Sequence, residues 1–223
     1  MINQARYRQD YDGEFVITET RWAAGKKEQT REWVPNPIEN QHISGRAACI
    51  VPSFDHELFD YTILNQHRGG LLGSKKLQTY GTGIIAQQMK LDFTVETDYS
   101  LLHKLIESQY QEKNIVYTTS RGCINNPGEF YLIPYNPVIA LEALPLYLAA
   151  FDGHKEIFMI GYNKETHTGS SSFANHVGNV IHSYPEITFT LIGKEPGMYK
   201  NWLELPNTRL FKNYRELISY CDI

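Results

Sequence analysis

The stretch that predicts the fold, residues 138–162, reads VIALEALPLYLAAFDGHKEIFMIGY. Its first part, 138–151, is rich in Ala and Leu and predicts a buried helix, with a kink expected at Pro145. A short turn follows, and 156–162 then carries the unbroken apolar run of a strand that is covered on both faces. A helix that leads into such a strand is one half of a doubly wound parallel sheet, in which ligands bind beyond the carboxyl ends of the strands. We therefore expect a site just after this strand.

Further apolar segments alternate along the chain in the same way. We expect strands at 47–51, 77–80, 93–95, 114–117 and 186–191, and helices at 100–111, 171–183 and 214–220. This alternation is typical of an α/β protein, and it predicts a Rossmann-like, doubly wound and mainly parallel sheet. The region 47–223 would form this Rossmann-like, nucleotide-binding catalytic domain.

The N-terminal region, residues 1–46, has a different pattern. Segments 14–22 and 28–34 have the composition of two strands around a Gly-containing turn, which predicts a β-hairpin appendage. An isolated hairpin is marginally stable in water, so this one is expected to pack on the main body or on another chain. Two interpretations stay open: a contact that forms a homo-oligomer, and a flap that binds an acceptor.

Composition narrows the functional classes. The 223 residues carry a net charge of -4, which gives no overall attraction to nucleic acid, although a local basic surface is compatible with it. No apolar run approaches the roughly 20 residues that span a bilayer, and the first residues lack an apolar signal core. The three cysteines have no paired spacing and are expected to be structural. A cytoplasmic protein is the expectation.

Small or hydrogen-bonding residues follow most of the predicted strands. Because the carboxyl ends of parallel strands share one edge of the sheet, these residues are candidates for binding a nucleotide, although each one alone is also typical of a helix cap. The candidates are Ser53, Thr82, Gly83, Asn136, Gly161 and Asn163.

His167 differs from the other histidines by its position. It follows the strand 156–162 by a few residues and precedes a segment with the composition of a helix start, which places an imidazole at the ligand edge. A solvent-exposed loop histidine is the equally open alternative. His154, before the same strand, would lie at the opposite edge and be structural. No His, Cys, Asp and Glu set has the spacing of a metal site, and the Asp10–Asp12 pair lies in the appendage, so no metal is expected.

A resemblance to a known family rests on residues 148–163, LAAFDGHKEIFMIGYN. This segment resembles small single-domain bacterial sialyltransferase-like glycosyltransferases and the related 6-hydroxymethylpterin diphosphokinase-like proteins. In those families a helix, a G-x-K-E-I turn and a strand that ends in Gly precede the catalytic lid. The chain has Asn163 where the families usually have Asp. Weaker likeness extends over about residues 47–220.

The resemblance implies a nucleotide sugar as the donor substrate, with no cofactor and no metal, and a histidine that deprotonates the acceptor hydroxyl. His167 is the match by position, and Arg121 or Lys164 would neutralise the leaving phosphate. The acceptor would be a glycan or a modified nucleic-acid base. One alternative is transfer of diphosphate from ATP to a pterin-like alcohol, with magnesium on Glu96 and Asp98. The other is a nucleotide-binding interaction module without catalysis.

Overall fold

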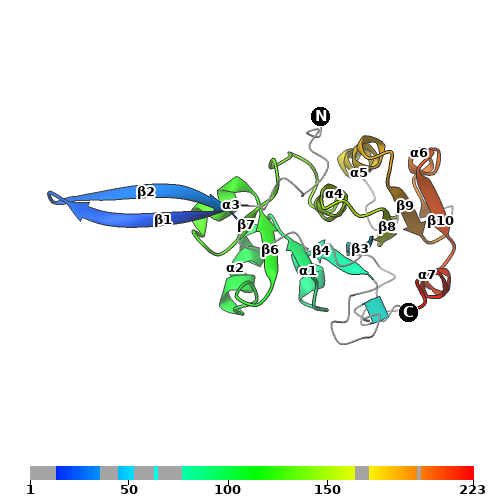
Figure 1. Ribbon diagram of the computed structural model, residues 1–223, viewed down its shortest axis with the longest axis horizontal. Coiled ribbons are helices and arrows are strands. Elements are labelled where there is room, and N and C mark those ends of the chain that lie inside the picture. Colours follow the sequence, from blue (N-terminus) through cyan, green and yellow to red (C-terminus); the bar gives the residue numbers. More distant parts are fainter. Residues whose placement is uncertain (1–13, 36–44, 53–62, 65–76, 164–170, 195–196) are drawn as a thin grey trace.

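The computed structural model of the protein describes residues 14–35, 45–52, 63–64, 77–163, 171–194 and 197–223 (Figure 1). It shows an α/β fold of the Rossmann-like class, in which helices cover both faces of a mainly parallel sheet. The predicted fold class is confirmed. In the described part of the chain no helix is both long enough and apolar enough to cross a membrane.

Within the described ranges the sheet has ten strands, of which two form the N-terminal hairpin. These two are β1 (Glu14–Ala23) and β2 (Lys26–Pro35). The parallel strands are β3 (Arg46–Ile50), β4 (Gln78–Thr82), β5 (Phe93–Val95), β6 (Ile115–Thr118), β7 (Tyr131–Leu132), β8 (Glu156–Ile160), β9 (Thr188–Ile192) and β10 (Thr208–Phe211). The helices are α1 (Gly83–Ala86), α2 (Tyr99–Glu107), α3 (Ser120–Asn125), α4 (Ala143–Phe151), α5 (Ser171–Ser183), α6 (Lys200–Leu203) and α7 (Tyr214–Cys221).

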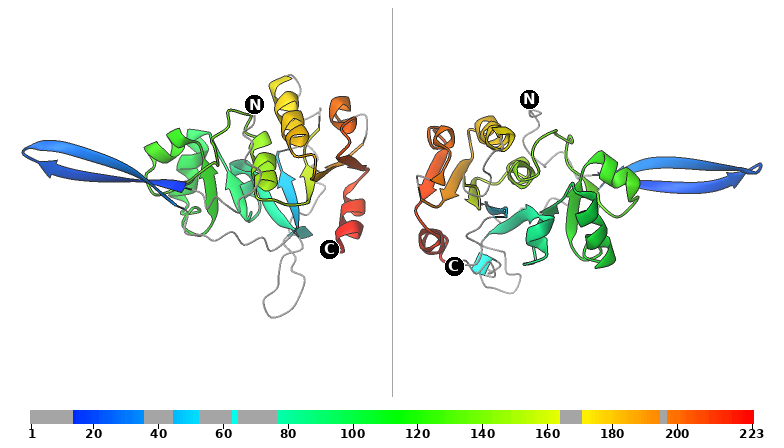
Figure 2. Two further views of the ribbon diagram at one scale, coloured as in Figure 1. Left: turned by 45° about the horizontal axis from the view of Figure 1, so that its top comes forward. Right: turned by 180° about the vertical axis from the view of Figure 1, so that it is seen from behind.

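The strand order, β10-β9-β8-β3-β4-β5-β6-β7-β1-β2, makes the sheet doubly wound. The chain builds outward from β3 to β7, returns through α4 to β8 on the other side of β3, and then continues outward to β10. Figures 1 and 2 show α4, α5 and α6 on one face, with α1, α2 and α7 on the other. The winding direction changes between β3 and β8, which is where open α/β sheets bind their ligands.

The central strands are apolar on both faces because each face carries its own layer of helices. Cys49 and Met159 pack with the helices α4 and α5, whereas the neighbouring Ile50 and Ile160 pack with α1 and α7. Every residue of α4 is buried, as its sequence predicted. The three cysteines are buried and form no disulfide, which agrees with the structural role expected of them. Burial raises the pKa of the Cys123 thiol to about 12, so it carries no nucleophilic thiolate near neutrality.

Several predicted boundaries were wrong. Helix α4 begins at Ala143 rather than at residue 138, and Val138 is exposed. Pro145 is therefore in the first helical turn, where its missing N–H removes no intrahelical hydrogen bond and the expected kink does not arise. Strand β8 ends at Ile160, because Gly161 takes a left-handed conformation with φ +87°. Strand β10 was not predicted.

The hairpin was predicted correctly, and its placement adds new information. Ala24 and Gly25 both have positive φ angles, +50° and +75°, as a two-residue type I′ turn requires. In the described residues the hairpin joins the sheet at its base, through the antiparallel pair of Glu14 with Leu132. The remainder extends away from the body as an arm (Figures 1 and 2).

Candidate ligand site at the carboxyl ends of the strands

The change of winding direction lies where β3 and β8 end. The ladder continues one residue past β3, since the Val51 N–H donates to the Ile160 carbonyl at 3.0 Å. Gly161 then turns the chain, and the Asn163 N–H donates back to the Gly161 carbonyl at 3.0 Å. Helix α5 begins a few residues further on. Gly161 and Asn163, two of the predicted nucleotide-binding residues, therefore lie at the expected point. Ser53, Lys164 and His167 lie outside the described residues.

Tyr162 fixes this turn, and sequence reasoning missed it. Its ring is buried and stacks on Phe173 of α5, with 6.2 Å between the centroids, while its hydroxyl donates to the Glu142 carbonyl at 2.8 Å. Burial raises the pKa of Tyr162 well above its usual value, so the phenol stays protonated. The sequence feature that could have revealed Tyr162 is an aromatic residue directly after the Gly at the end of a strand. This feature is too common to be specific.

Exposed apolar side chains gather at this end of the sheet. The described residues include six large apolar side chains that are exposed, and four of them follow a strand of the parallel set. These four are Ile84 after β4, Tyr99 after β5, and Tyr135 and Val138 after β7. Two of the four, Tyr99 and Tyr135, are aromatic, and exposed aromatic rings are suited to stacking against a planar ligand.

A cationic and hydrogen-bonding cluster lies among them. The guanidinium of Arg121, at the start of α3, lies over the ring of Tyr99, 5.4 Å from its centroid. The Asn136 side chain accepts from the Ser120 N–H and donates to the Ser120 hydroxyl, both at 3.3 Å. The structure thus brings Arg121 and Asn136, predicted separately, to one place at the ends of β5, β6 and β7.

Strand order separates this cluster from Gly161. The strands β3, β4 and β5 lie between β8 and β6. Neighbouring strands are about 4.8 Å apart, so Arg121 follows a strand that lies about 19 Å from β8. A phosphate held beside Gly161 is therefore beyond the direct reach of Arg121. Arg121 belongs to the far end of the ligand edge, so its predicted role at a leaving phosphate stays a prediction for a phosphate at that end.

Gly83 has a structural role that the sequence did not reveal. Its N–H donates to Glu96 Oε2 at 3.1 Å, and a Cβ on Gly83 would lie 2.5 Å from that oxygen. The other oxygen of Glu96 accepts from the N–H groups of Thr97 and Asp98, both at 2.8 Å. The Gly83 N–H is therefore already used within the protein. The neighbouring Thr82 is buried, and its hydroxyl has no hydrogen-bond partner among the described residues.

The acidic pair proposed for magnesium is engaged in backbone contacts. Glu96 is fully buried, and burial raises its pKa although its backbone hydrogen bonds act to lower it. Asp98 caps α2 by accepting from the N–H groups of Ser100 and Leu101. Across the described ranges no group of three or more His, Cys, Asp and Glu residues could hold a metal ion. Asp10 and Asp12 lie outside those ranges.

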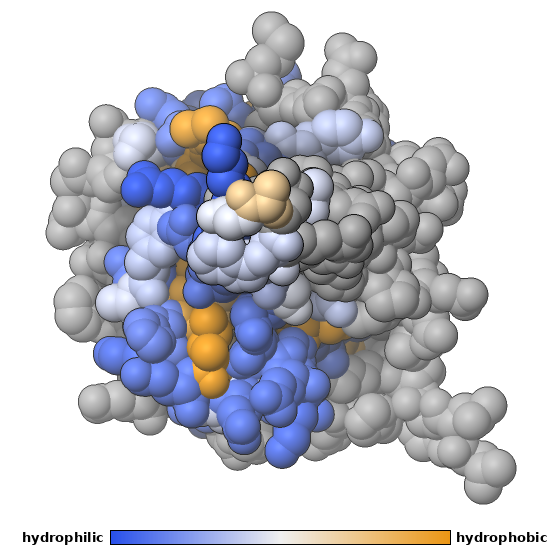
Figure 3. Space-filling model, turned by 90° about the vertical axis from the view of Figure 1, so that its left-hand side faces the viewer, coloured by the Kyte–Doolittle hydropathy of each residue, from blue (hydrophilic) through white to orange (hydrophobic). Residues whose placement is uncertain are grey.

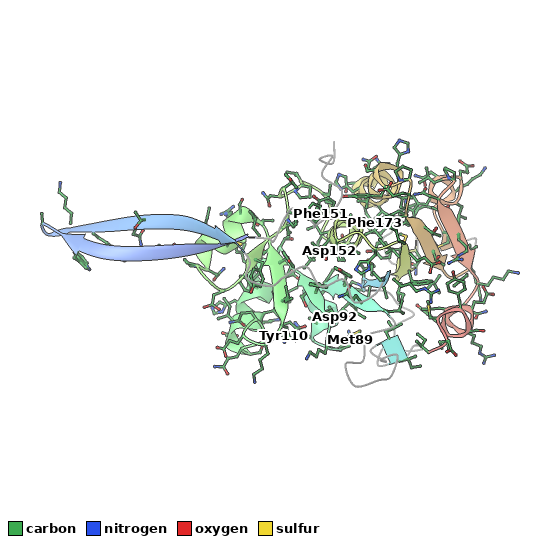
Figure 4. All side chains as sticks on the ribbon, viewed as in Figure 1. Met89, Asp92, Tyr110, Phe151, Asp152 and Phe173 are labelled. Atoms are coloured by element: carbon green, nitrogen blue, oxygen red, sulfur yellow. The ribbon has the colours of Figure 1, made fainter. Side chains whose placement is uncertain are left out.

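The amino ends of the strands hold two internal polar clusters. The Tyr80 hydroxyl contacts Asp152 Oδ2 at 2.7 Å and His154 Nε2 at 2.9 Å, and all three residues are buried. Figure 4 labels Asp152 at the end of α4, and its contact with Tyr80 of β4 places its carboxylate against the sheet. Glu156, partly buried, binds Arg46 at 2.7 Å and Arg209 at 3.5 Å. His154 thus lies at the end opposite the candidate site, as predicted.

A shallow groove of about 500 Å³ lies elsewhere, between β10 and α7 at the outer edge of the sheet. It is lined by Phe211, Asn213, Arg215, Glu216, Ser219 and Tyr220. The strand order places it two strands beyond β8, away from the change of winding direction. The carboxyl ends of β3 and β8 remain the better candidate, because the topology of the sheet leads there.

Comparisons with known proteins gave no relative: no family model, no curated protein and no solved structure matches this chain.

Proposed function

We propose that the protein is a glycosyltransferase that moves a sugar from a nucleotide-sugar donor to an acceptor hydroxyl, with inversion and without a metal ion. The observation that carries this proposal is the carboxyl edge of the sheet: the winding direction changes there between β3 and β8, and exposed aromatic and cationic side chains follow β5, β6 and β7 further along the same edge. Doubly wound sheets bind nucleotides at this position.

The donor would lie along this edge. Helix α5 begins after Gly161 and Asn163, and the N–H groups of its first turn are suited to the phosphates. Tyr99 and Arg121, at the other end of the edge, offer an aromatic and guanidinium surface to the nucleotide base or to the acceptor. Lys164, by its position in the sequence, is assigned to the leaving phosphate.

The chemical step is a single displacement. The acceptor hydroxyl oxygen forms a bond to the anomeric carbon while the bond from that carbon to the phosphate oxygen breaks, which inverts the configuration. His167 takes the hydroxyl proton, and the nucleotide leaves with both electrons of the broken bond. The resemblance of residues 148–163 to sialyltransferase-like enzymes supports this assignment.

The alternative, diphosphate transfer to a pterin-like alcohol, has less support. It needs acidic ligands for magnesium at the strand ends, and Glu96 and Asp98 were the best candidates. Both carboxylates instead accept hydrogen bonds from backbone N–H groups, and Glu96 has no exposed surface. Binding a metal at Glu96 would compete with its hydrogen bonds from the N–H groups of Gly83, Thr97 and Asp98.

The test is a screen of nucleotide sugars, read as release of the free nucleotide, in the presence of EDTA and again with added magnesium. We expect one donor class to be hydrolysed slowly in both conditions and faster with an acceptor. A requirement for magnesium together with consumption of ATP would favour the diphosphokinase. The absence of turnover and of any thermal shift with every nucleotide would refute the proposal.

A further inference from the structure

The hairpin arm, β1 and β2, is the largest feature that the proposed function leaves unused. Each strand has ten residues, which at about 3.3 Å per residue gives a ribbon about 30 Å long. Its base pairs with β7, and the arm then leaves the body (Figure 1). A two-stranded ribbon on its own is marginally stable in water, so a partner that binds it contributes to its order.

The register of the ribbon places four described side chains on one face near the tip. Trp22 pairs with Lys27, and Thr20 pairs with Gln29. The Gln29 amide donates to the Thr20 hydroxyl at 3.5 Å, as residues on the same face can. Trp22 is 74% exposed, the largest exposure of any described aromatic side chain. Figure 3 looks along the arm from its tip. This face therefore offers an open aromatic ring beside an amine, an amide and a hydroxyl.

The charge of the outer arm is opposite to that of the chain. Residues 20–30 contain the basic residues Arg21, Lys26 and Lys27 and one acidic residue, Glu28, whereas the whole chain has a net charge of -4. Lys26 and Lys27 are both exposed beside the turn. A positive tip on a negative molecule is complementary to a polyanion.

We propose that this arm binds single-stranded nucleic acid. An unpaired base stacks on Trp22, one flanking phosphate contacts Lys27 on the same face, the next contacts Lys26 beside the turn on the opposite face, and Gln29 supplies a hydrogen-bonding group. A protein partner is a poorer fit because the cores of protein interfaces are depleted in lysine. A lipid surface is a poorer fit because Trp22 is the only large apolar residue among residues 20–30.

The base of the arm leads toward the candidate site. Strand β1 packs against α3 and pairs with β7, and α3 begins with Ser120 and Arg121. Arg121 lies over Tyr99, a second aromatic and cationic pair at the carboxyl edge of the sheet. A strand bound along the arm would therefore continue to this edge. In the terms of the proposed function, the acceptor is then a modified nucleic-acid base that carries a hydroxyl, but the binding itself does not depend on any transfer activity.

The experiment measures fluorescence anisotropy of labelled oligothymidylate and oligouridylate of about 20 nucleotides, over a range of salt concentrations, with the full-length chain and no donor present. Trp22→Ala should weaken binding about ten-fold or more, the effect of losing one stacked base, and Trp22→Phe should restore part of it. The double variant Lys26→Ala/Lys27→Ala should reduce the slope of log K against log salt by about 1.4, for two phosphate contacts on a single strand.

A matched control removes two exposed lysines elsewhere, Lys113→Ala/Lys212→Ala, with the same change in net charge. It should bind like the unchanged protein. Each of four results would overturn the proposal: no binding, equal binding of a duplex of the same length, equal losses in the control, or binding of anionic vesicles instead. Self-association that needs Trp22, without oligonucleotide binding, would assign the arm to a second copy of this chain. None of these results depends on finding a sugar donor, so the proposed function stands or fails separately.

Discussion

The two ends of the parallel strands each hold a glutamate, and the protein stabilises these two carboxylates by different means. Glu156, at the amino ends, binds the side chains of Arg46, Arg209 and Tyr220. Glu96, at the carboxyl ends, is fully buried and accepts from three backbone N–H groups. The amino end is closed by side-chain ion pairs. At the carboxyl end, backbone N–H groups bind the carboxylate of Glu96, and aromatic and cationic side chains remain exposed.

The pKa shifts of the two glutamates follow from this difference. Burial acts to raise the pKa of Glu156, but the hydrogen bonds from Tyr220 and Arg46 and the charges of Arg46 and Arg209 outweigh it and lower the pKa. For Glu96, burial outweighs the backbone hydrogen bonds and raises the pKa. Glu156 therefore stabilises the fold above the pKa of an unfolded glutamate, and this contribution is lost as the pH falls through its folded pKa. Glu96 has the opposite pH dependence. Its contribution to the stability of the fold is present below the pKa of an unfolded glutamate and is lost as the pH rises through its raised folded pKa.

The largest expected effect compares His167, which the sequence assigns to the ligand edge, with His154 at the amino ends of the strands. His167→Ala should lower kcat by about 10²–10⁴-fold, the range for a general base, with little change in the KM of the donor. His154→Ala should leave kcat per folded molecule unchanged and instead reduce the free energy of unfolding by about 1–3 kcal/mol, because it removes the contact with Tyr80 in a buried cluster. Steady-state kinetics and thermal unfolding of both variants decide this. Near-normal turnover in the His167 variant would remove the catalytic assignment.

The second prediction concerns the ion pairs of the amino end. Glu156→Gln should lower the free energy of unfolding by about 2 kcal/mol at neutral pH, since it removes a partly buried charge that binds two arginines. The variant should also lose less stability than the unchanged protein between about pH 5 and pH 3, because it lacks the carboxylate with the lowered pKa. Urea unfolding across this pH range measures both effects. Parallel pH profiles for the two proteins would contradict the assignment.

The third prediction concerns the backbone contacts of the carboxyl end. Gly83→Ala should reduce the free energy of unfolding by about 1–2 kcal/mol, because the added Cβ would lie 2.5 Å from Glu96 Oε2 and must displace a buried carboxylate. If Gly83 serves ligand binding alone, this stability loss will be absent and only donor affinity will fall. Thermal unfolding without ligand separates the two roles.

The sequence predicted the sheet because the fold follows from local patterns. The unbroken apolar run of β8 required helices on both faces, and the alternation of elements required parallel strands. Strand β10 escaped prediction because its four residues include a single buried one, Phe211. The start of α4 was placed too early because the apolar residues before Ala143 continue the same composition without forming helical turns.

The site was predictable as an edge but not as a set of contacts. Asn136, Gly161 and Asn163 lie after strands, as predicted, because strand ends can be read from the sequence. The separation of Arg121 from Gly161 depends on strand order, which no local pattern contains. The role of Gly83 depends on a carboxylate 13 residues away that approaches its backbone in the folded chain. Tyr99 was missed because an exposed aromatic at a helix start has no distinctive sequence pattern.

The smallest expected effect tests whether the cost at Gly83 belongs to its position or to any helical glycine in this chain. Gly178 lies inside α5, away from both ends of the strands, and its conformation is helical. A Cβ there would lie 3.4 Å from the nearest atoms of the Trp202 ring, an ordinary van der Waals distance. Gly178→Ala should therefore stabilise the protein by about 0.5–1 kcal/mol, through the lower backbone entropy of alanine in the unfolded chain. If Gly83→Ala lowers and Gly178→Ala raises the free energy of unfolding in the same urea titration, the strain is confined to the carboxyl end. A lower free energy of unfolding for both variants would show that tight packing around the helices, rather than the position of Gly83, causes the loss.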